Sequence, residues 1–205
     1  MLRIENLSKR YGDHVVFQGL NYTFAPGCVV LNDEDNTGKS TLLGILAGVI
    51  APDAGDVRVN GHSMAQAPHA AKASLAYVPD NCLAFPAQTG REWLKQAARE
   101  KNTQIDETVL DLADRLELLE HLDKRFEQMS TGTRRKVFLT ACALGAPAVI
   151  LADGPSNGLD TPARAMLAEQ FRIWSADRVV LFASHDAVLV EACQARPLGL
   201  NSLRG

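Results

Sequence analysis

The chain alternates short hydrophobic runs with polar loops and amphipathic stretches. Four runs have the apolar character of strands that are buried on both faces of a sheet, namely residues 28–31, 75–78, 148–152 and 178–183. Shorter β-type runs lie at residues 2–4, 15–17, 22–24 and 57–59. Helical patterns lie between the buried strands, at residues 42–49, 89–122, 133–144 and 162–174. This alternation predicts an α/β fold whose parallel sheet is covered on both faces.

The segment 89–122 differs from the rest and predicts a helical insert between two α/β halves. Thr89 and Glu92 at its start have the spacing of a capping box. We interpret an apolar stripe at steps of three and four residues as the core-facing side of a helix; it consists of Val109, Leu112, Leu116 and Leu119. Ligands of parallel sheets bind at the carboxyl ends of the strands. The residues expected there are Asp33, Pro79, Asp153 and Ser184.

Length, net charge and cysteine content limit the classes of protein to which this chain can belong. A chain of 205 residues, 46% of them hydrophobic, predicts one domain with a substantial core. Its net charge of −3 argues against nucleic acid as a partner, because such binders usually carry clustered Lys and Arg. The four cysteines are widely spaced and predict buried thiols in a reducing compartment, with neither a zinc site nor a disulfide framework. No apolar run approaches the roughly 18 residues of a membrane span, so we expect a cytoplasmic protein that reaches a membrane only through a partner.

A polar loop at residues 33–41 carries the strongest local signal for chemistry. It lies between a buried strand and an apolar helix, and it ends in the sequence TGKST. Phosphate-binding loops use backbone N–H groups at a helix N-terminus, a lysine that reaches the β- and γ-phosphates, and a hydroxyl that binds Mg²⁺. Lys39 and Ser40 match the last two roles, and Gly38 lets the backbone approach the phosphates.

Two positions of this loop depart from the pattern G-x-x-x-x-G-K-[ST]. Asp33 replaces the first glycine, and Asn36 replaces another residue that is commonly glycine. Both types tolerate a positive φ better than most residues, so we expect the loop to form. A carboxylate about 6 Å from a phosphate charge would nevertheless cost about 3 kcal/mol at an effective dielectric of 20, and Asp33 is the residue concerned. The alternative interpretation is an acidic loop that only caps a helix.

Further motifs follow in a defined order along the chain. Tyr11 follows the sequence LSKR, and residues 77–80 read YVPD at the end of a predicted strand. Residues 126–137 read FEQMSTGTRRKV, and residues 149–160 read VILADGPSNGLD. The sequence SHD at residues 184–186 follows another predicted strand.

Each motif alone has an ordinary structural explanation. Ser130 alone is a helix N-cap, Tyr11 is a surface aromatic, His185 is a core or surface residue, and residues 134–136 are the solvated face of a helix. In their order and spacing, however, the motifs resemble those of the ATP-binding-cassette (ABC) ATPases over essentially the whole chain. The resemblance implies a P-loop NTPase fold: a RecA-like parallel-sheet core, an antiparallel β subdomain, and a helical subdomain inserted at about residues 85–140 of a single domain over 1–205.

The resemblance also implies cofactors and site residues. The cofactors are ATP and Mg²⁺, and two chains sandwich ATP between the phosphate loop of one and the signature segment of the other. The implied ATP-binding residues are Tyr11 at the adenine, together with Asp33, Asn36, Thr37, Gly38, Lys39, Ser40, Thr41, Ser130, Gly132 and Asp160. The implied Mg²⁺ ligands are Ser40 and, through water, Asp153. The implied catalytic residues are Asp80, at the metal or the attacking water, and His185, at the γ-phosphate.

Two positions depart from the family in ways that bear on activity. Gly154 replaces the glutamate that polarises the attacking water, and Asp80 replaces the usual glutamine. Because general-base assistance is worth about 10²–10⁴-fold, we expect ATP binding with weak hydrolysis. We therefore expect an ATP-binding subunit that forms a homodimer or heterodimer and drives a separate transmembrane permease at the inner membrane. The alternative is a regulatory or structural module that binds ATP without useful turnover.

Overall fold

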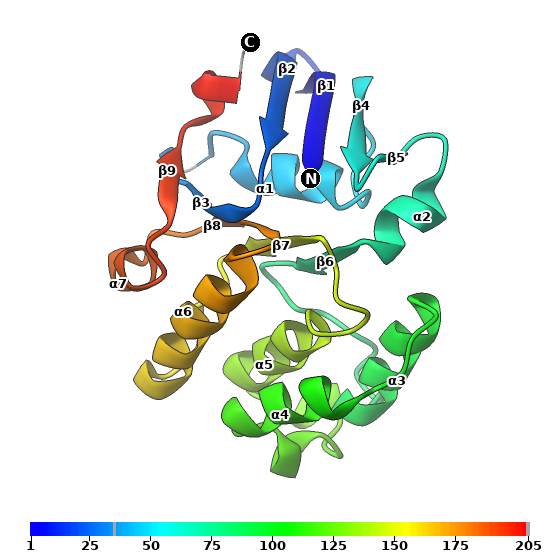
Figure 1. Cartoon of the computed structure of the whole chain (residues 1–205), viewed down its shortest axis with the longest axis vertical. Coiled ribbons are helices and arrows are strands. Elements are labelled where there is room, and N and C mark those ends of the chain that lie inside the picture. Colours follow the sequence, from blue (N-terminus) through cyan, green and yellow to red (C-terminus); the bar gives the residue numbers. More distant parts are fainter. Residues whose placement is uncertain (35, 204–205) are drawn as a thin grey trace.

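The computed structural model describes residues 1–34 and 36–203 and contains two sheets (Figure 1). The strands of the parallel sheet, in their spatial order, are β6 (Leu75–Val78), β7 (Val149–Asp153), β8 (Val179–Ala183), β3 (Gly27–Leu31) and β9 (Arg196–Leu198). The strands of the antiparallel sheet are β2 (His14–Phe24), β1 (Leu2–Tyr11), β4 (Ala54–Val59) and β5 (His62–Ser63). The predicted α/β class, with a parallel core and a separate antiparallel sheet, is confirmed.

Helices occupy most of the remaining chain. The α-helices are α1 (Lys39–Leu46), α2 (Pro68–Ala73), α3 (Gly90–Glu100), α4 (Glu107–Arg115), α5 (Thr131–Ala141), α6 (Thr161–Ser175) and α7 (Ala187–Ala192). Three short 3₁₀ turns are η1 (Leu119–His121), η2 (Phe126–Gln128) and η3 (Leu200–Leu203). Figure 1 shows α3, α4 and α5 grouped on one side of the parallel sheet. The boundaries of a helical subdomain at about residues 85–140 stay a prediction.

The parallel sheet separates two hydrophobic cores. Alternate strand residues face opposite sides, so Val180 and Phe182 pack with the helices α3 to α7, whereas Val179 and Leu181 pack with α1 and the antiparallel sheet. Figure 1 shows α1 between the two sheets, and α5 and α6 on the other side of the parallel sheet. This two-sided burial explains why the predicted strands read as unbroken apolar runs.

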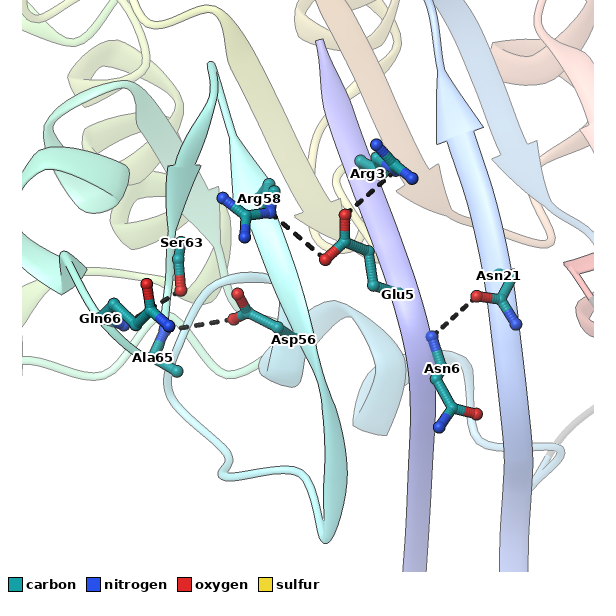
Figure 2. Close-up of polar contacts among 9 residues, drawn as sticks. All are labelled: Arg3, Glu5, Asn6, Asn21, Asp56, Arg58, Ser63, Ala65 and Gln66. Carbon is teal, nitrogen blue, oxygen red and sulfur yellow. Dashed lines mark hydrogen bonds and ion pairs between the residues drawn. The ribbon is translucent and has the colours of Figure 1, made fainter.

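The antiparallel strands are longer than predicted because bulges interrupt their alternation of polar and apolar residues. β1 continues to Tyr11, and the two predicted runs at 15–17 and 22–24 belong to the single strand β2. The pairing of these strands shifts register after Ile4, where Asn6 has a φ of 49°. Figure 2 shows that the Asn6 N–H donates to the side chain of Asn21, at 2.8 Å. The side chain thus replaces a ladder hydrogen bond that the bulge removes.

Polar side chains also form contacts between neighbouring segments of this sheet (Figure 2). The Glu5 carboxylate lies between Arg3 of its own strand, at 3.2 Å, and Arg58 of β4, at 3.3 Å. Asp56 accepts the backbone N–H of Ala65 at 3.2 Å, beyond the hairpin of β4 and β5. These exposed pairs set strand register more than they add stability, since surface ion pairs are typically worth about 0–1 kcal/mol.

The segment 89–122 is helical as predicted, but it is divided into α3, α4 and η1. Asn102 and Glu117 have positive φ values of 52° and 53°, which end α3 and α4 respectively. The predicted stripe is buried at Val109, Leu112 and Leu116, but Leu119 lies beyond the second break and is 39% exposed. A helical period therefore does not continue across a left-handed residue.

All four cysteines are buried free thiols, as predicted. Their spacing gave no sign that the Sγ atoms of Cys28 and Cys193 lie 3.8 Å apart, because β3 and the end of α7 meet only in the folded chain. In the part of the chain that the structure describes, no helix has the length and apolar character needed to cross a membrane.

The capping box of α3 gives a testable consequence. Glu92 N–H donates to Thr89 Oγ1 at 3.2 Å, and Thr89 N–H donates to the Glu92 carboxylate at 2.8 Å. We expect Thr89→Ala to lower the free energy of unfolding by about 1 kcal/mol, because it leaves helix N–H groups without their acceptor. Urea denaturation measures the change. Thr108→Ala, at an exposed position within α4, is the matched control, and equal losses in both variants would contradict a capping role.

Candidate functional site

The register of the parallel sheet brings four loops to one edge. Leu31 at the end of β3 pairs with Ala183 of β8, which pairs with Asp153 at the end of β7. β6 runs parallel to β7, with Val78 opposite Ala152. Because parallel strands have their carboxyl ends at the same edge, the loops after them leave side by side. These loops contain the predicted residues around positions 33–39, Asp80, residues 153–160 and His185.

The loop after β3 has the geometry of a phosphate-binding loop. Gly38 caps α1 with a φ of 102°, and a Cβ there would lie 2.3 Å from Val16 Cγ1. Both the positive φ and the close approach of Val16 therefore favour glycine at this position. Asn36 has a φ of 60°, which confirms the predicted tolerance of this position for asparagine. The Lys39 ammonium is buried and donates to the carbonyls of Asp33 and Glu34, at 2.5 Å each. A cation and the N-terminus of α1 therefore lie together in this loop.

The expectation for Asp33 is corrected in two respects. Its φ is not among the positive values of the described residues, so the position does not need the conformation of the glycine it replaces. Its carboxylate accepts the backbone N–H of Leu200, at the start of η3, with a distance of 2.8 Å. The negative charge thus has a partner in the C-terminal segment, 167 residues away in sequence. No pattern in the sequence indicates this contact.

A cavity of about 510 Å³ joins this loop to Tyr11. The residues that line it are Tyr11, His14, Val16, Asn36, Gly38, Lys39, Ser40 and Thr41. The Tyr11 ring is 51% exposed, and the Lys9 ammonium lies 5.2 Å from its centroid. Six predicted ATP-binding residues share the cavity, whereas Thr37 lies outside its lining and bonds back to the Glu34 carbonyl at 2.9 Å. Sequence reasoning missed His14 and Val16, although the pairing of His14 with Tyr11 across a hairpin turn places them there.

Ser40 and Asp153 line one cavity at this edge of the sheet, and their role as metal ligands stays a prediction. The Ser40 hydroxyl hydrogen-bonds the Asp153 carboxylate, and burial raises the pKa of Asp153 against the opposing effect of that bond. Hydroxyl and carboxylate oxygens are ligands that suit Mg²⁺, which keeps several waters and binds substrate phosphates. Among the described residues no group of three His, Cys, Asp or Glu side chains forms a metal cage. A site of few protein ligands therefore fits Mg²⁺ with a phosphate ligand.

Arg135 is the main residue that sequence reasoning missed. The interpretation of residues 134–136 as a solvated face is wrong for Arg135, which is 1% exposed, and for Lys136, which is also buried. Arg135 Nη1 donates to the carbonyls of Asp153 at 3.1 Å and Gly154 at 2.7 Å, and Nη2 donates to the carbonyl of Asp80. Helical spacing could have indicated this burial, because Arg135 lies three residues before Phe138 and therefore on the same, buried side of α5.

The surroundings of Gly154 explain why this position is glycine. Gly154 has a φ of 53°, and a Cβ there would lie 2.3 Å from Asn157 Nδ2 and 2.9 Å from Asp80 Oδ1. Asn157 donates to Asp80 Oδ1 at 3.0 Å, and Arg135 Nη2 lies 3.6 Å from the same oxygen. The backbone conformation therefore disfavours a larger residue, and a side chain there would displace the ends of the Asn157 and Asp80 side chains.

The signature-like residues form a second group in the described chain. Ser130 caps α5, with its hydroxyl accepting the Thr133 N–H at 3.1 Å, and Gly132 packs so closely on Gly158 that a Cβ would lie 2.2 Å from its carbonyl oxygen. Asp160 caps α6 through the Ala163 N–H at 2.8 Å. Ser130, Gly132 and Asp160 line a cavity of about 490 Å³ that includes no residue of the phosphate loop.

His185 lies at the predicted edge of the sheet. It follows β8 by two residues and is exposed. The neighbouring residues fix the loop, since Asp186 N–H donates to the Ser184 hydroxyl at 3.0 Å and the Asp186 side chain caps α7. The predicted role of His185 at a γ-phosphate stays a prediction.

The comparisons with known proteins agree with this geometry. The sequence model of the ABC transporter family matches residues 17–157, more than half of the chain. The chain belongs to this family. A relative from Halobacterium salinarum, named as an ABC transporter ATP-binding protein, is 32% identical over 91% of the chain and 83% of its own length. Members of this family bind ATP in a P-loop ATPase fold, and the chain is such an ATP-binding cassette.

Other relatives are longer than this chain. The Nod factor export ATP-binding protein I of Paraburkholderia xenovorans is 30% identical, and the match covers 90% of the chain and 62% of the relative. The sn-glycerol-3-phosphate import protein UgpC 1 of Rhizobium etli is 30% identical over 83% of the chain and 50% of its own length. The chain thus spans between half and two thirds of these two transport ATPases.

Solved structures confirm the fold of the ABC cassette. An ATP-binding subunit of an ABC transporter superposes with a TM-score of 0.84 at 24% identity, covering 93% of this chain and 82% of that one. A dimeric ATP-binding cassette in a post-hydrolysis state with ADP and Pi gives a TM-score of 0.84 at 18% identity, covering 97% and 94%.

The crowding around Gly154 predicts the cost of any side chain there. Gly12 is a matched control, because its φ of 56° is similar and a Cβ there meets nothing within 4 Å. We expect Gly12→Ala to lower the free energy of unfolding by about 1–2 kcal/mol, the cost of a left-handed alanine. Gly154→Ala should cost about 0.5–1.5 kcal/mol more, the typical net value of a hydrogen bond, because the added Cβ displaces Asn157 from Asp80. Thermal and urea unfolding measure both variants, and equal costs would show that Asn157 and Asp80 do not occupy this space.

Proposed function

We propose that the chain is the ATP-binding subunit of a transporter that dimerises around Mg-ATP, drives a separate membrane permease, and hydrolyses ATP weakly at its own site. The observation that carries the proposal is the meeting of Lys39, Gly38 and the Ser40–Asp153 pair at the N-terminus of α1. A triphosphate needs this combination of cation, free helix N–H groups and metal ligands.

The roles proposed for the site residues follow from their positions. The backbone of residues 36–41 and the Lys39 ammonium bind the phosphates, which replace the carbonyls of Asp33 and Glu34 as partners of Lys39. Ser40 and Asp153 hold Mg²⁺, which when bound neutralises charge on the β- and γ-phosphates. Tyr11 stacks on the adenine at the other end of the same cavity. Asp80 and His185 lie at the γ-phosphate end, where the four loops meet.

The separation of the two residue groups supports a composite site between two chains. Ser130 and Gly132 line a different cavity from the phosphate loop, so one chain alone does not surround a nucleotide with both. We propose that the signature residues act on the nucleotide of a second cassette and that Asp160 contacts that cassette. In a homodimer both sites lack the usual glutamate, whereas a heterodimer can pair this signature segment with a partner site that retains it.

Weak hydrolysis follows from Gly154. The position offers no side chain to accept a proton from water, and general-base assistance is typically worth about 10²–10⁴-fold. Phosphoryl transfer otherwise depends on positioning and electrostatics, which this site retains. The same observation favours a second candidate function: a regulatory module that binds ATP without driving transport.

A cleft beside the loop after β6 supports a membrane partner. It has a volume of about 620 Å³ and is lined mostly by apolar residues of the loop after α1 and of α2, β6, α3 and α5, including Val49, Tyr77, Trp93 and Phe138. Val49 is 70% exposed, which is unusual for a large aliphatic residue in a cleft. We propose that a cytoplasmic helix of the permease docks here and holds the chain at the cytoplasmic face of the membrane. The relatives include an exporter and an importer, so the proposal specifies no direction.

Loss of the Lys39 ammonium tests nucleotide binding. We expect Lys39→Ala to weaken the affinity for Mg-ATP at least about 10-fold, because buried charge-assisted contacts to phosphate are worth roughly 1.5–3 kcal/mol. Isothermal titration calorimetry measures the affinity, with Lys95→Ala on the exposed face of α3 as the control. Equal affinities for Lys39→Ala and the unmodified chain, or no binding by the unmodified chain, would refute the proposed nucleotide site.

A substitution in the apolar cleft distinguishes the transporter subunit from the regulatory module. We expect the chain to co-purify with a multi-spanning membrane protein of its own cell, and Val49→Asp to abolish this association by burying a charge in the interface. Val188→Asp, at an exposed position of α7, should leave the association intact. Mg-ATP affinity, measured on both variants, confirms that the cassette is folded. A chain that binds ATP but stays monomeric and associates with no membrane protein supports the regulatory module instead.

A further inference from the structure

We propose that Cys28 and Cys193 form a reversible intramolecular disulfide when the folded chain meets hydrogen peroxide, and that this bridge locks the C-terminal segment, residues 193–203, onto the parallel sheet. The basis is a pair of buried free thiols that lie in contact although 165 positions separate them in sequence. Because the bridge needs no nucleotide, its formation is independent of the function proposed above.

The fold holds the two thiols side by side. Cys28 lies on β3 and Cys193 caps the C-terminus of α7, and their Sγ atoms are 3.8 Å apart. Gln194 has a φ of 53° and turns the chain out of α7, so that Arg196 pairs with Val29 in the parallel ladder of β9 and β3. The sheet therefore fixes the backbone close to both cysteines. A disulfide needs the sulfurs about 2.0 Å apart, and rotations about the two Cα–Cβ bonds can supply an approach of this size.

The surroundings of the pair favour Cys193 as the thiol that ionises first. The Cys28 thiol donates to Cys193 Sγ, and this bond, with a backbone hydrogen bond from Ala195, lowers the pKa of Cys193 against the opposing effect of burial. The thiolate is the nucleophilic form of cysteine. Cys28 is 9% exposed, whereas Cys82 and Cys142 are 0% and 1% exposed, so a small oxidant reaches the pair more easily than it reaches these two thiols.

Hydrogen peroxide supplies all the oxidising power that the reaction needs. The Cys193 thiolate attacks one peroxide oxygen, an S–O bond forms, and the O–O bond breaks. The hydroxide that leaves takes up the proton that Cys193 released, which gives a sulfenic acid and one water. The Cys28 sulfur then attacks the sulfenic sulfur, the S–S bond forms, and the S–O bond breaks, so that the hydroxyl leaves with the Cys28 proton as a second water. The two sulfurs together lose the two electrons that reduce the peroxide, and a dithiol reverses the bridge by exchange.

The bridge connects elements on both sides of the phosphate loop. β9 is an edge strand of three residues, and its ladder partner is β3. Beyond β9, the Leu200 N–H donates to the Asp33 carboxylate. On the other side of Cys193, α7 begins two residues after His185. The bridge therefore ties α7 and the segment that contacts Asp33 to the strand that leads into the phosphate loop. Disulfides of cytosolic proteins are usually transient and redox-sensing, which suits a reversible lock.

Peptide mapping tests the bridge directly. The reduced chain is treated with hydrogen peroxide while folded, its remaining thiols are alkylated after unfolding, and the digest is analysed without reduction. We expect a cross-linked peptide that contains Cys28 and Cys193, alkylated Cys82 and Cys142, and loss of the cross-link with dithiothreitol. Sulfinic acid in place of the cross-link, a disulfide between two chains, or four alkylated cysteines would overturn the proposal.

Thermal unfolding tests the stabilising effect of the bridge. Because a cross-link restricts the unfolded chain, we expect peroxide to raise the unfolding midpoint by about 5–10 °C. Cys193→Ala should abolish this rise. Cys142→Ala is the matched control and should retain it, since Cys142 is a buried cysteine whose Sγ donates to a helix carbonyl at 3.5 Å. An equal rise in both variants contradicts the proposal, and peptide mapping of the unmodified chain decides the matter if a variant does not fold.

Hydrogen exchange tests where the bridge acts. In the oxidised chain we expect the amide protons of residues 187–203 to exchange at least about 10-fold more slowly than in the reduced chain, because the cross-link suppresses local opening of this segment. The amide protons of α4, in the helical group that does not contain the bridge, should exchange at the same rate in both forms. Equal exchange of residues 187–203 in the two forms would show that the bridge locks nothing.

Discussion

The buried guanidinium of Arg135 is the interaction on which the arrangement of the site depends. It joins the carbonyl of Asp80, after β6, to those of Asp153 and Gly154, at the end of β7. A buried charge is costly unless it is hydrogen-bonded and paired; three carbonyl oxygens accept the hydrogen bonds of this guanidinium, and the Asp80 carboxylate lies 3.6 Å from its Nη2. Because the guanidinium is planar and rigid, it fixes the distance between the two loops. The distance between the side chains of these two loops is therefore set by the buried Arg135.

Much of the fold was predictable because the parallel sheet is buried on both faces. Residues 75–78 form β6 as predicted, and β7 and β8 each differ from their predicted ranges by a single residue at one or both ends. The breaks within the helical region were not predictable in the same way. Asn102 and Glu117 adopt a positive φ that hydrophobic periodicity does not encode. The two-residue and three-residue strands β5 and β9 are too short to show any period.

The residues of the candidate site were also predictable only where local sequence positions them. Gly38, Lys39 and Ser40 were predictable because one continuous segment, a strand followed by a loop and a helix, positions all three. The partners of Asp33 and Arg135 were not, because Leu200 and Asp80 approach them only through the register of the sheet. The penalty expected for an acid in the phosphate loop assumed an inward carboxylate. The Leu200 N–H instead gives that carboxylate a partner outside the loop.

Gly154 is best understood together with the residues that surround it. A residue with a φ of 53° disfavours any side chain, and Asn157 and Asp80 fill the space that a side chain would enter. Reintroducing glutamate alone would therefore strain the backbone and displace two hydrogen-bonded neighbours before it added a carboxylate. The family motif alone indicates that position 154 lacks a carboxylate. The structure, however, places the Asp80 carboxylate beside this position, in contact with the Asn157 amide and the Arg135 guanidinium. The chemistry of this edge of the sheet follows from what occupies the space, and one position of a motif does not determine it.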